Sequence, residues 1–271
     1  LRRRADDGGV ALFASAAAAV AGRALVISAV TADATLEVAR TAAPHLAPGA
    51  LFLDLNSASP GVKQAAAEAV EAAGGRYVEA AVMTSVPPYR LAVPMLLGGP
   101  HAADCAALLA GYGTDITVGD ARIGVASATK MCRSVVTKGL EALIVEGLSA
   151  ARHYGVEDKV MASLAETFPG IDWEKQAAYL FSRVVLHGRR RAAEMRESAR
   201  TVDEAGFDPW MPAATAERQQ WVADLTAAGV FADLDSAAFD WRQATDAILA
   251  ADKARRAVAV RDRLGRGPER R

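Results

Sequence analysis

The chain has 271 residues, 52% of them hydrophobic, and a formal net charge of −1 at pH 7. Its length allows one or two domains with a large core, and its near-neutral charge gives no electrostatic reason to expect nucleic acid or a membrane surface as a partner. No apolar run reaches the roughly 18 residues that span a bilayer, and no signal-peptide pattern is found.

Short apolar runs alternate with helical patterns in the first half of the chain. Strands are predicted at residues 24–30, 50–55, 76–82, 93–99 and 114–118. The helices between them are predicted from a cap at Asp33 to about residue 43, from Pro60 to about residue 73 with Ser59 as the N-cap, and at residues 102–109. This alternation predicts a mostly parallel, Rossmann-like sheet with helices on both faces.

Only helical patterns follow Gly119. They are predicted at residues 124–155, 157–167, 172–186, 189–205, 213–229 and 237–262, and a basic tail follows at residues 263–271. We therefore predict an α/β domain at residues 1–122, followed by an all-α domain at residues 123–271.

The predicted helix at residues 124–155 is the most informative segment. It opens on small residues, contains no proline, is apolar over most of its surface and can end at Gly155. Lys130, Ser134 and Lys138 are spaced four apart and share one face. A lysine in a buried helix must face a partner or a cleft. The stripe is therefore either a structural ion pair or part of a functional site.

Small polar residues follow three of the predicted strands. Val30 and Thr31 end the first strand, Ser57 follows the second, and Thr84 and Ser85 follow the third. In parallel α/β sheets, ligands bind beyond the carboxyl ends of the strands. Helix capping and loop solvation are the alternative explanation, and for a loop residue such as Ser59 capping and ligand contact can coexist.

Cysteine and histidine usage gives no sign of a disulfide or a metal. Cys105 and Cys132 each lie among apolar residues, so we expect two buried free thiols in a cytoplasmic protein. The four histidines are far apart and lack metal-ligand spacing.

The G-x-G-x-x-G turn of a dinucleotide-binding sheet does not occur in this sequence. The predicted sheet therefore reads as lacking its first strand–helix–strand unit, either because the chain is a piece of a longer protein or because the unit is lost. We expect residues 1–271 to bind NAD(P) weakly, and an in-frame strand with G-x-G-x-x-G upstream of Leu1 would favour an enzyme.

Five segments in a fixed order carry a family resemblance: LVISAV, LFLDLNSASP, YVEAAVMTSVPP, LLGG and GVASATKMCRSVVTKGLEAL. Together they resemble the β-hydroxyacid dehydrogenase and 6-phosphogluconate dehydrogenase superfamily. More closely, they are similar to its bacterial branch of NAD(P)-dependent oxidoreductases with a C-terminal helical domain of unknown function. The resemblance covers roughly residues 10–230.

The resemblance implies that residues 1–122 form an N-terminally incomplete dinucleotide-binding domain and that residues 123–271 form a substrate and dimerisation domain. It implies hydride transfer between NAD or NADP and a small hydroxyl or carbonyl compound. It implies that Lys130 is the general acid/base and that the cofactor contacts Val30, Thr31 and Ser57. Substrate contacts are expected at Thr84, Ser85, Arg133 and Ser134, with Arg133 suited to an anionic group. A homodimer is implied too, and the tryptophans spread along the helical half, Trp173, Trp210, Trp221 and Trp241, offer apolar surface for it.

Departures from the superfamily pattern fall among the expected substrate contacts. Met83-Thr84-Ser85 stands in place of a serine-glycine-glycine loop, Arg133 and Ser134 stand in place of asparagines, and RAAEM replaces a lysine-aspartate pair at residues 191–195. The resemblance thus supports hydride transfer without defining the substrate or choosing between NAD and NADP. The alternative function is that of a non-catalytic remnant acting as a binding or scaffold protein.

Overall fold

The computed structural model describes residues 2–236 and 238–265. By its contacts the chain divides into two compact units. The sheet unit comprises Leu1–Val135 and Ala193–Trp210, and the helical unit comprises Val136–Ala192 and Met211–Arg271. Two long helices each contribute residues to both units, so these units do not correspond to a single cut in the sequence. The division after residue 122 remains a prediction.

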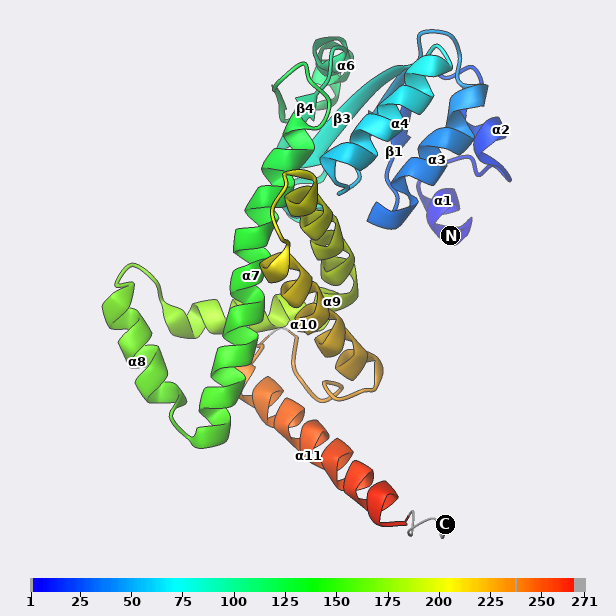
Figure 1. Ribbon diagram of the computed structural model, residues 1–271. Coiled ribbons are helices and arrows are strands. Elements are labelled where there is room, and N and C mark those ends of the chain that lie inside the picture. The colour runs from blue at the N-terminus through cyan, green and yellow to red at the C-terminus, as the bar shows by residue number, and fades with distance from the viewer. Residues whose placement is uncertain (1, 237, 266–271) are drawn as a thin grey trace. The chain divides into compact units, whose positions relative to one another are not determined.

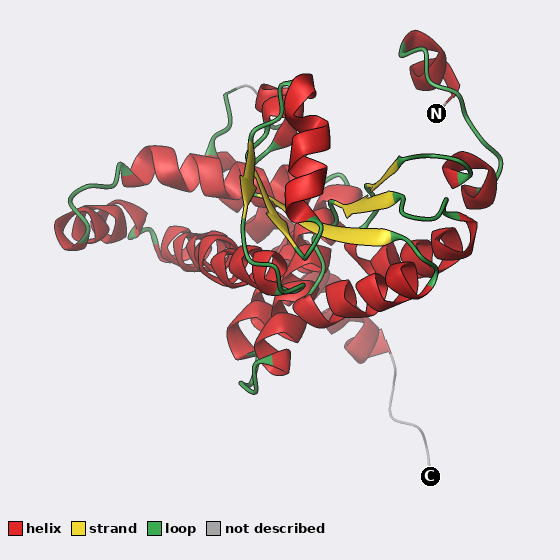
Figure 2. Cartoon of the chain, turned by 90° about the horizontal axis from the view of Figure 1, so that it is seen from above, coloured by secondary structure: helices red, strands yellow, loops and turns green. Residues whose placement is uncertain are grey.

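The sheet unit is built on five strands, drawn in yellow in Figure 2. They are β1 (Leu25–Ser28), β2 (Leu51–Asp54), β3 (Arg76–Val82), β4 (Met95–Gly98) and β5 (Ile116–Val118), and they lie in the order β1-β2-β3-β4-β5. All neighbouring pairs are parallel except β3 and β4, which confirms the predicted mostly parallel sheet. Ser28 pairs with Asp54 and Asp54 with Glu79, so the carboxyl ends of the first three strands share one edge.

The sheet has a buried core on each face because successive strand residues point to opposite sides. Phe52 and Tyr77 pack in one cluster with residues of two helices that lie side by side in Figure 1, α3 (Thr35–Ala42) and α4 (Pro60–Ala72). Leu53 and Val78 pack in the other cluster with α6 (Ala102–Leu109). This confirms the expected Rossmann-like layering.

Short helical segments complete the sheet unit. These are α1 (Arg2–Asp7), α2 (Ala16–Val20), α5 (Val86–Tyr89) and 3₁₀ turns at Ala32–Ala34, Ala43–His45, Arg90–Ala92 and Ala110–Tyr112. Ser59 caps α4 as predicted, because its hydroxyl accepts the backbone N–H of Val62. The predicted cap at Asp33 is wrong: Asp33 lies inside the first 3₁₀ turn, and α3 begins at Thr35.

The helical unit contains residues 136–154 of α7 (Val125–Tyr154) and residues 173–192 of α9 (Trp173–Glu204). It also contains α8 (Glu157–Thr167), nearly all of α10 (Trp210–Ala227), and α11 (Trp241–Gly265), which Figure 1 labels. Trp173, Phe181 and Trp241 are buried in its core. Residues 237 and 266–271, on which the start of the last predicted helix and most of the predicted basic tail fall, lie outside the described residues. No helix in the described part of the chain combines the length and apolar character needed to cross a membrane.

The prediction of two helices at residues 172–186 and 189–205 is wrong, because α9 runs through Gly188 without a break. A Cβ at Gly188 would lie 2.8 Å from the carbonyl oxygen of Gln219 on α10. This glycine therefore allows two helix backbones to approach closely and does not end a helix.

The expectation of a nearly all-buried α7 is also wrong. Val136 and Leu143 are 72% and 58% exposed, and Cys132 is exposed as well. Only Cys105 fits the expected buried thiol, and burial raises the pKa of its thiol to about 11. Helix α7 is thus amphipathic, with Met131 and Ser134 on its covered side.

Lys63 on α4 is 2.8 Å from the Asp54 carboxylate, and both side chains are 1% exposed. Tyr77 donates its hydroxyl to the same carboxylate, and burial followed by the Asp54 charge holds the pKa of Tyr77 well above its usual value. A buried carboxylate of this kind is stable in the core only while its counter-charge and hydrogen bonds are present.

Replacing Lys63 with Ala should therefore lower the free energy of unfolding by about 3–5 kcal/mol, because the Asp54 carboxylate loses its counter-charge. Arg122→Ala is the control: the Arg122 side chain is 79% exposed in its pair with Asp120, and such a pair contributes less than about 1 kcal/mol. Urea denaturation followed by circular dichroism measures both losses. Equal losses would contradict a special role for the buried pair.

Candidate active site

The candidate site lies in the sheet unit, where the loop after β2 meets α7. The ammonium of Lys130 donates to the hydroxyl oxygen of Ser57, with 2.7 Å between Nζ and Oγ. Ser57 follows β2 by three residues and is half-buried, as is Lys130. The structure therefore joins the predicted acid/base to a residue expected to contact the cofactor, at the strand edge where parallel sheets bind ligands.

Glu79 of β3 fixes the helix that carries Lys130. Its carboxylate is completely buried and accepts the first backbone N–H groups of α7, from Gly124 at 2.7 Å and from Ala126 and Ser127 at 3.2 Å each. A negative charge at a helix N-terminus satisfies unpaired N–H groups and opposes the helix dipole. A Cβ at Gly98 would lie 2.7 Å from the same carboxylate, so the neighbouring strand must have glycine there.

Asn56 ties the ends of β1 and β2 together. Its side-chain oxygen accepts the backbone N–H of Val30 at 2.6 Å, and its side-chain nitrogen donates to Ser28 at 3.0 Å. Val30, whose side chain is 40% exposed, is thereby held beside the loop that carries Ser57. Three of the predicted site residues, Val30, Ser57 and Lys130, thus lie on segments that hydrogen bonds join to one another.

Two carboxylates that the sequence analysis missed occupy the N-terminus of α4. Glu197 accepts the backbone N–H of Ser59 at 2.9 Å, and Glu204 accepts the Ser59 hydroxyl at 2.7 Å and the Gly61 N–H at 2.9 Å. Their spacing of seven residues places both on one face of α9 and was the available signal. Because this helix end already holds two acidic side chains, it is closed to a phosphate group.

The other predicted site residues lie on three segments of the sheet unit: the loop after β1, the loop after β3 and helix α7. Thr84 and Ser85 are exposed in the loop after β3, on the same sheet edge as Ser57. Arg133 is exposed, whereas Ser134, one turn beyond Lys130, is buried. Thr31 is exposed, and its hydroxyl lowers the pKa of Asp33 by hydrogen bonding to that carboxyl.

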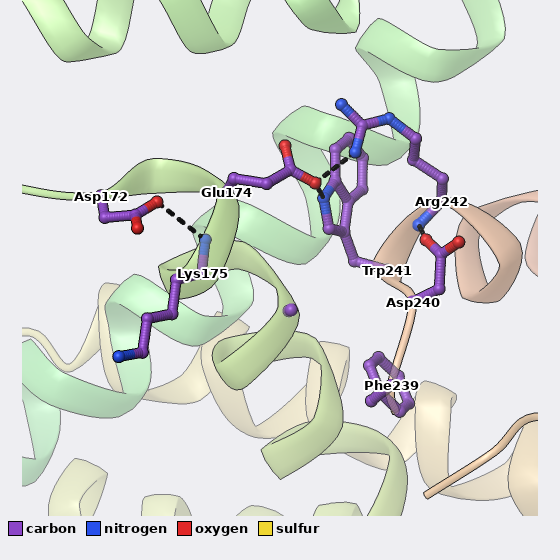
Figure 3. Close-up of a pocket in the computed structure, with 8 residues that line it drawn as sticks. Asp172, Glu174, Lys175, Phe239, Asp240, Trp241 and Arg242 are labelled. Atoms are coloured by element: carbon purple, nitrogen blue, oxygen red, sulfur yellow. Dashed lines mark hydrogen bonds and ion pairs between the residues drawn. The ribbon is translucent and has the colours of Figure 1, made fainter. Parts of the chain in front are cut away.

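Two surface hollows are lined by residues other than Lys130 and Ser57. One, of about 400 Å³, is lined by Asp172, Glu174, Lys175, Ala178, Phe239, Asp240, Trp241 and Arg242. Figure 3 shows the Glu174 carboxylate beside the Trp241 indole and the Arg242 guanidinium, and it accepts a hydrogen bond from each, so these polar groups satisfy one another. The other, of about 450 Å³, lies on α3 and is lined by Asp33, Leu36, Glu37, Arg40 and Thr41.

Within residues 2–236 and 238–265, no group of three acidic, histidine or cysteine side chains could hold a metal ion.

Comparison with known proteins adds family information to this geometry. The model of the NAD binding domain of 6-phosphogluconate dehydrogenase matches residues 2–119, and that of a domain of unknown function, DUF1932, matches residues 151–222. A crystal structure of a conserved hypothetical protein from Sinorhizobium meliloti 1021 is 39% identical, with a TM-score of 0.68 over 89% of this chain and 78% of that one.

Two further solved structures share the fold. A conserved protein of unknown function with structural similarity to 3-hydroxyacid dehydrogenases is 32% identical, with a TM-score of 0.65 over 84% of each chain. The 3-hydroxyisobutyrate dehydrogenase of Mycobacterium tuberculosis, solved with L-serine, is 20% identical, with a TM-score of 0.59 over 90% of this chain and 86% of that one. At that identity the likeness concerns the fold alone.

The Glu79 contact generates a stability prediction. Glu79→Gln keeps the shape of the side chain but removes the charge that three N–H groups share, so we expect the free energy of unfolding to fall by about 1.5–3 kcal/mol. The control Glu146→Gln removes a carboxylate that is 64% exposed and should cost less than about 1 kcal/mol. Thermal and urea denaturation measure both, and a neutral Glu79→Gln would refute the anchoring role.

Proposed function

The chain belongs to the family of 6-phosphogluconate dehydrogenase-like proteins that join an NAD-binding domain to a DUF1932 domain, and from this premise we propose that it is an oxidoreductase. The proposed reaction transfers a hydride between NAD or NADP and a small hydroxyl or carbonyl compound. The observation that carries the proposal is the 2.7 Å contact between Lys130 and Ser57 at the carboxyl edge of a parallel sheet.

The residues at this edge suit the ring end of a nicotinamide cofactor. Val30 offers exposed apolar surface, its N–H being already bound to Asn56, while Thr31 and Ser57 offer hydroxyl groups. A flat ring needs this combination of apolar contact and a few hydrogen bonds. The N-terminus of α4 would not hold the pyrophosphate, because Glu197 and Glu204 occupy it. The bound nicotinamide supplies or accepts the hydride.

Lys130 is proposed to move the proton that accompanies the hydride. Oxidation of an alcohol requires a group that accepts the hydroxyl proton, and reduction of a carbonyl requires the same group to return it. Ser57 accepts a hydrogen bond from Nζ and so fixes the direction in which the lysine points. The ammonium of Lys130 is thereby held at the same edge of the sheet as the exposed side chain of Val30.

Substrate contacts are proposed at Thr84, Ser85, Arg133 and Ser134. The two loop hydroxyls are exposed at the shared strand edge and can bind a polar substrate, and Arg133 offers a cation for an acidic group. The M. tuberculosis structure is that of a 3-hydroxyisobutyrate dehydrogenase with L-serine. The first substrates to test with NAD⁺ and NADP⁺ are therefore 3-hydroxyisobutyrate and L-serine.

Lys130→Met should lower kcat by about 10²–10⁴-fold, the usual contribution of a positioned acid/base, while NADH or NADPH affinity stays nearly unchanged. Turnover is followed by nicotinamide absorbance, and affinity by titration of nicotinamide fluorescence. The matched control is Lys138→Met, two turns along the same helix, where the lysine is 7% exposed. We expect that variant to lose stability but keep turnover.

Two outcomes would contradict the assignment of Lys130. A fully active Lys130→Met protein would remove it from the chemistry. Equal losses of turnover in the Lys130 and Lys138 variants would mean that the polar stripe of α7 is structural.

A homodimer is proposed through the helical unit. Trp173 and Trp241 are core residues, 6% and 1% exposed, so the expectation of interface surface is wrong for these two, whereas Trp210 is 76% exposed. Exposed apolar residues lie elsewhere, in pairs seven apart and thus on one helix face: Val136 and Leu143 on α7, Tyr179 and Leu186 on α9. Apolar rows of this kind are typical of subunit contacts.

Light scattering at micromolar concentration should give twice the monomer mass of 28.3 kDa. Leu143→Glu should shift this mass toward the monomer, because it places a charge in the apolar row. Val118→Glu is the control, since Val118 is 47% exposed in the sheet unit and outside these rows. A monomeric wild-type protein would refute the dimer.

A further inference from the structure

Asn56 is only 4% exposed, and its backbone N–H and both polar atoms of its side chain have hydrogen-bond partners. Its backbone N–H donates to the Asp54 carboxylate at 2.9 Å, its side-chain oxygen accepts from Val30 N–H, and its side-chain nitrogen donates to Ser28. A buried side-chain amide whose oxygen and nitrogen each have a fixed partner holds one orientation.

The partners of Asn56 are themselves fixed. Asp54 is completely buried, and its carboxylate is held by the Lys63 ammonium at 2.8 Å and by the Tyr77 hydroxyl at 2.6 Å. Lys63 also donates to the Asp54 carbonyl at 3.1 Å. Charge-assisted hydrogen bonds between buried groups are strong and directional. The loop after β2 is therefore held rigidly at Asn56, its second residue.

This rigid loop connects both halves of the proposed chemistry. On one side, the side chain of Asn56 holds Val30, where the nicotinamide ring is proposed to lie. On the other side, the next residue is Ser57, whose hydroxyl is 2.7 Å from Lys130 Nζ. We propose that Asn56 is a positioning residue, which sets the place of Lys130 relative to the hydride-transfer site. The proposal rests on the proposed function of Lys130.

The side-chain chemistry explains why asparagine is suited to this position. One oxygen must accept from Val30 while one nitrogen donates to Ser28, and only an amide offers both at this length. Aspartate would lose the donor and place a second carboxylate beside buried Asp54. Alanine would release both strand ends.

The first test needs neither cofactor nor substrate. Acetic anhydride labels lysine amines, and mass spectrometry measures the labelling rate of Lys130 against exposed Lys175 in the same protein. Ser57→Ala should raise the Lys130 rate by about tenfold, the effect of losing one hydrogen bond to a charged group. Asn56→Ala should raise it by about threefold, because Ser57 remains but is no longer held in place.

Thr35→Ala is the matched control. It also removes a buried side-chain hydrogen bond, from Thr35 to the Ala32 carbonyl at 2.8 Å, but at the start of α3. We expect it to leave the Lys130 labelling rate unchanged. If Asn56→Ala does not fold, Ser28→Ala decides instead, since it removes only the partner of the Asn56 nitrogen and should raise the rate about twofold. An unchanged labelling rate of Lys130 in a folded Asn56→Ala protein overturns the proposal. If Asn56→Ala does not fold, an unchanged labelling rate of Lys130 in Ser28→Ala overturns it.

The second test uses turnover. In Asn56→Ala, kcat should fall by about 10-fold or more, and the primary deuterium isotope effect, measured with NAD(P)H deuterated at the transferred position, should rise. A merely structural loss would lower kcat by reducing the folded fraction and leave the isotope effect unchanged, which would overturn the proposal. If the wild-type protein has no turnover, the proposed function fails, and the labelling experiment still decides whether Asn56 positions Lys130.

Discussion

The contact between the Glu79 carboxylate and the start of α7 is the constraint on which the site depends. It joins the centre of the sheet to a helix of 30 residues, and it does so where the helix has unpaired N–H groups and a positive dipole end. Because the carboxylate is completely buried, the contact is not screened by water. Lys130 lies less than two turns beyond it, so the position of Nζ follows from the position of Glu79.

A second buried carboxylate, Asp54, fixes the loop after β2, which carries Ser57. The parallel register pairs it with Glu79, so two neighbouring strands each place an acidic side chain in the core. The two charges are stabilised differently, Asp54 by the ammonium of Lys63 and Glu79 by backbone N–H groups. Buried charges are costly unless they are fully partnered. Here each one fixes a segment of the site, α7 in one case and the Asn56–Ser57 loop in the other.

Local patterns predicted local structure well. Proline after Ser59 gave the start of α4, alternating apolar runs gave the five strands, and the four-residue spacing of Lys130 and Ser134 placed both on one face of α7. Long-range pairings could not be read in this way. Glu79 reads as one polar residue in a strand pattern, and its partners begin 45 residues later.

The errors have the same origin. The predicted break between residues 186 and 189 includes Gly188, and glycine has low helix propensity, but α9 continues through it in close contact with α10. Cys132 was expected in the core because α7 is rich in apolar residues, whereas the helix turns that side outward. The sequence does not say which part of an apolar surface is covered within one chain. Roles for Thr84, Ser85, Arg133 and Ser134 rest on resemblance and remain proposals.

The capping of α4 by α9 has a consequence for how the protein is made. Ser59 and Gly61 receive their carboxylate partners from residues that lie 138, 145 and 143 positions further along the chain. The sheet unit is therefore not complete when its last strand leaves the ribosome. The N-terminus of α4 lacks its full set of carboxylate partners until Glu204 has been synthesised. Contacts of such sequence separation form late and slow the folding of a domain. A polypeptide that stops after the last strand would expose this helix end, so the sheet cannot be treated as a module that folds before the helices are synthesised.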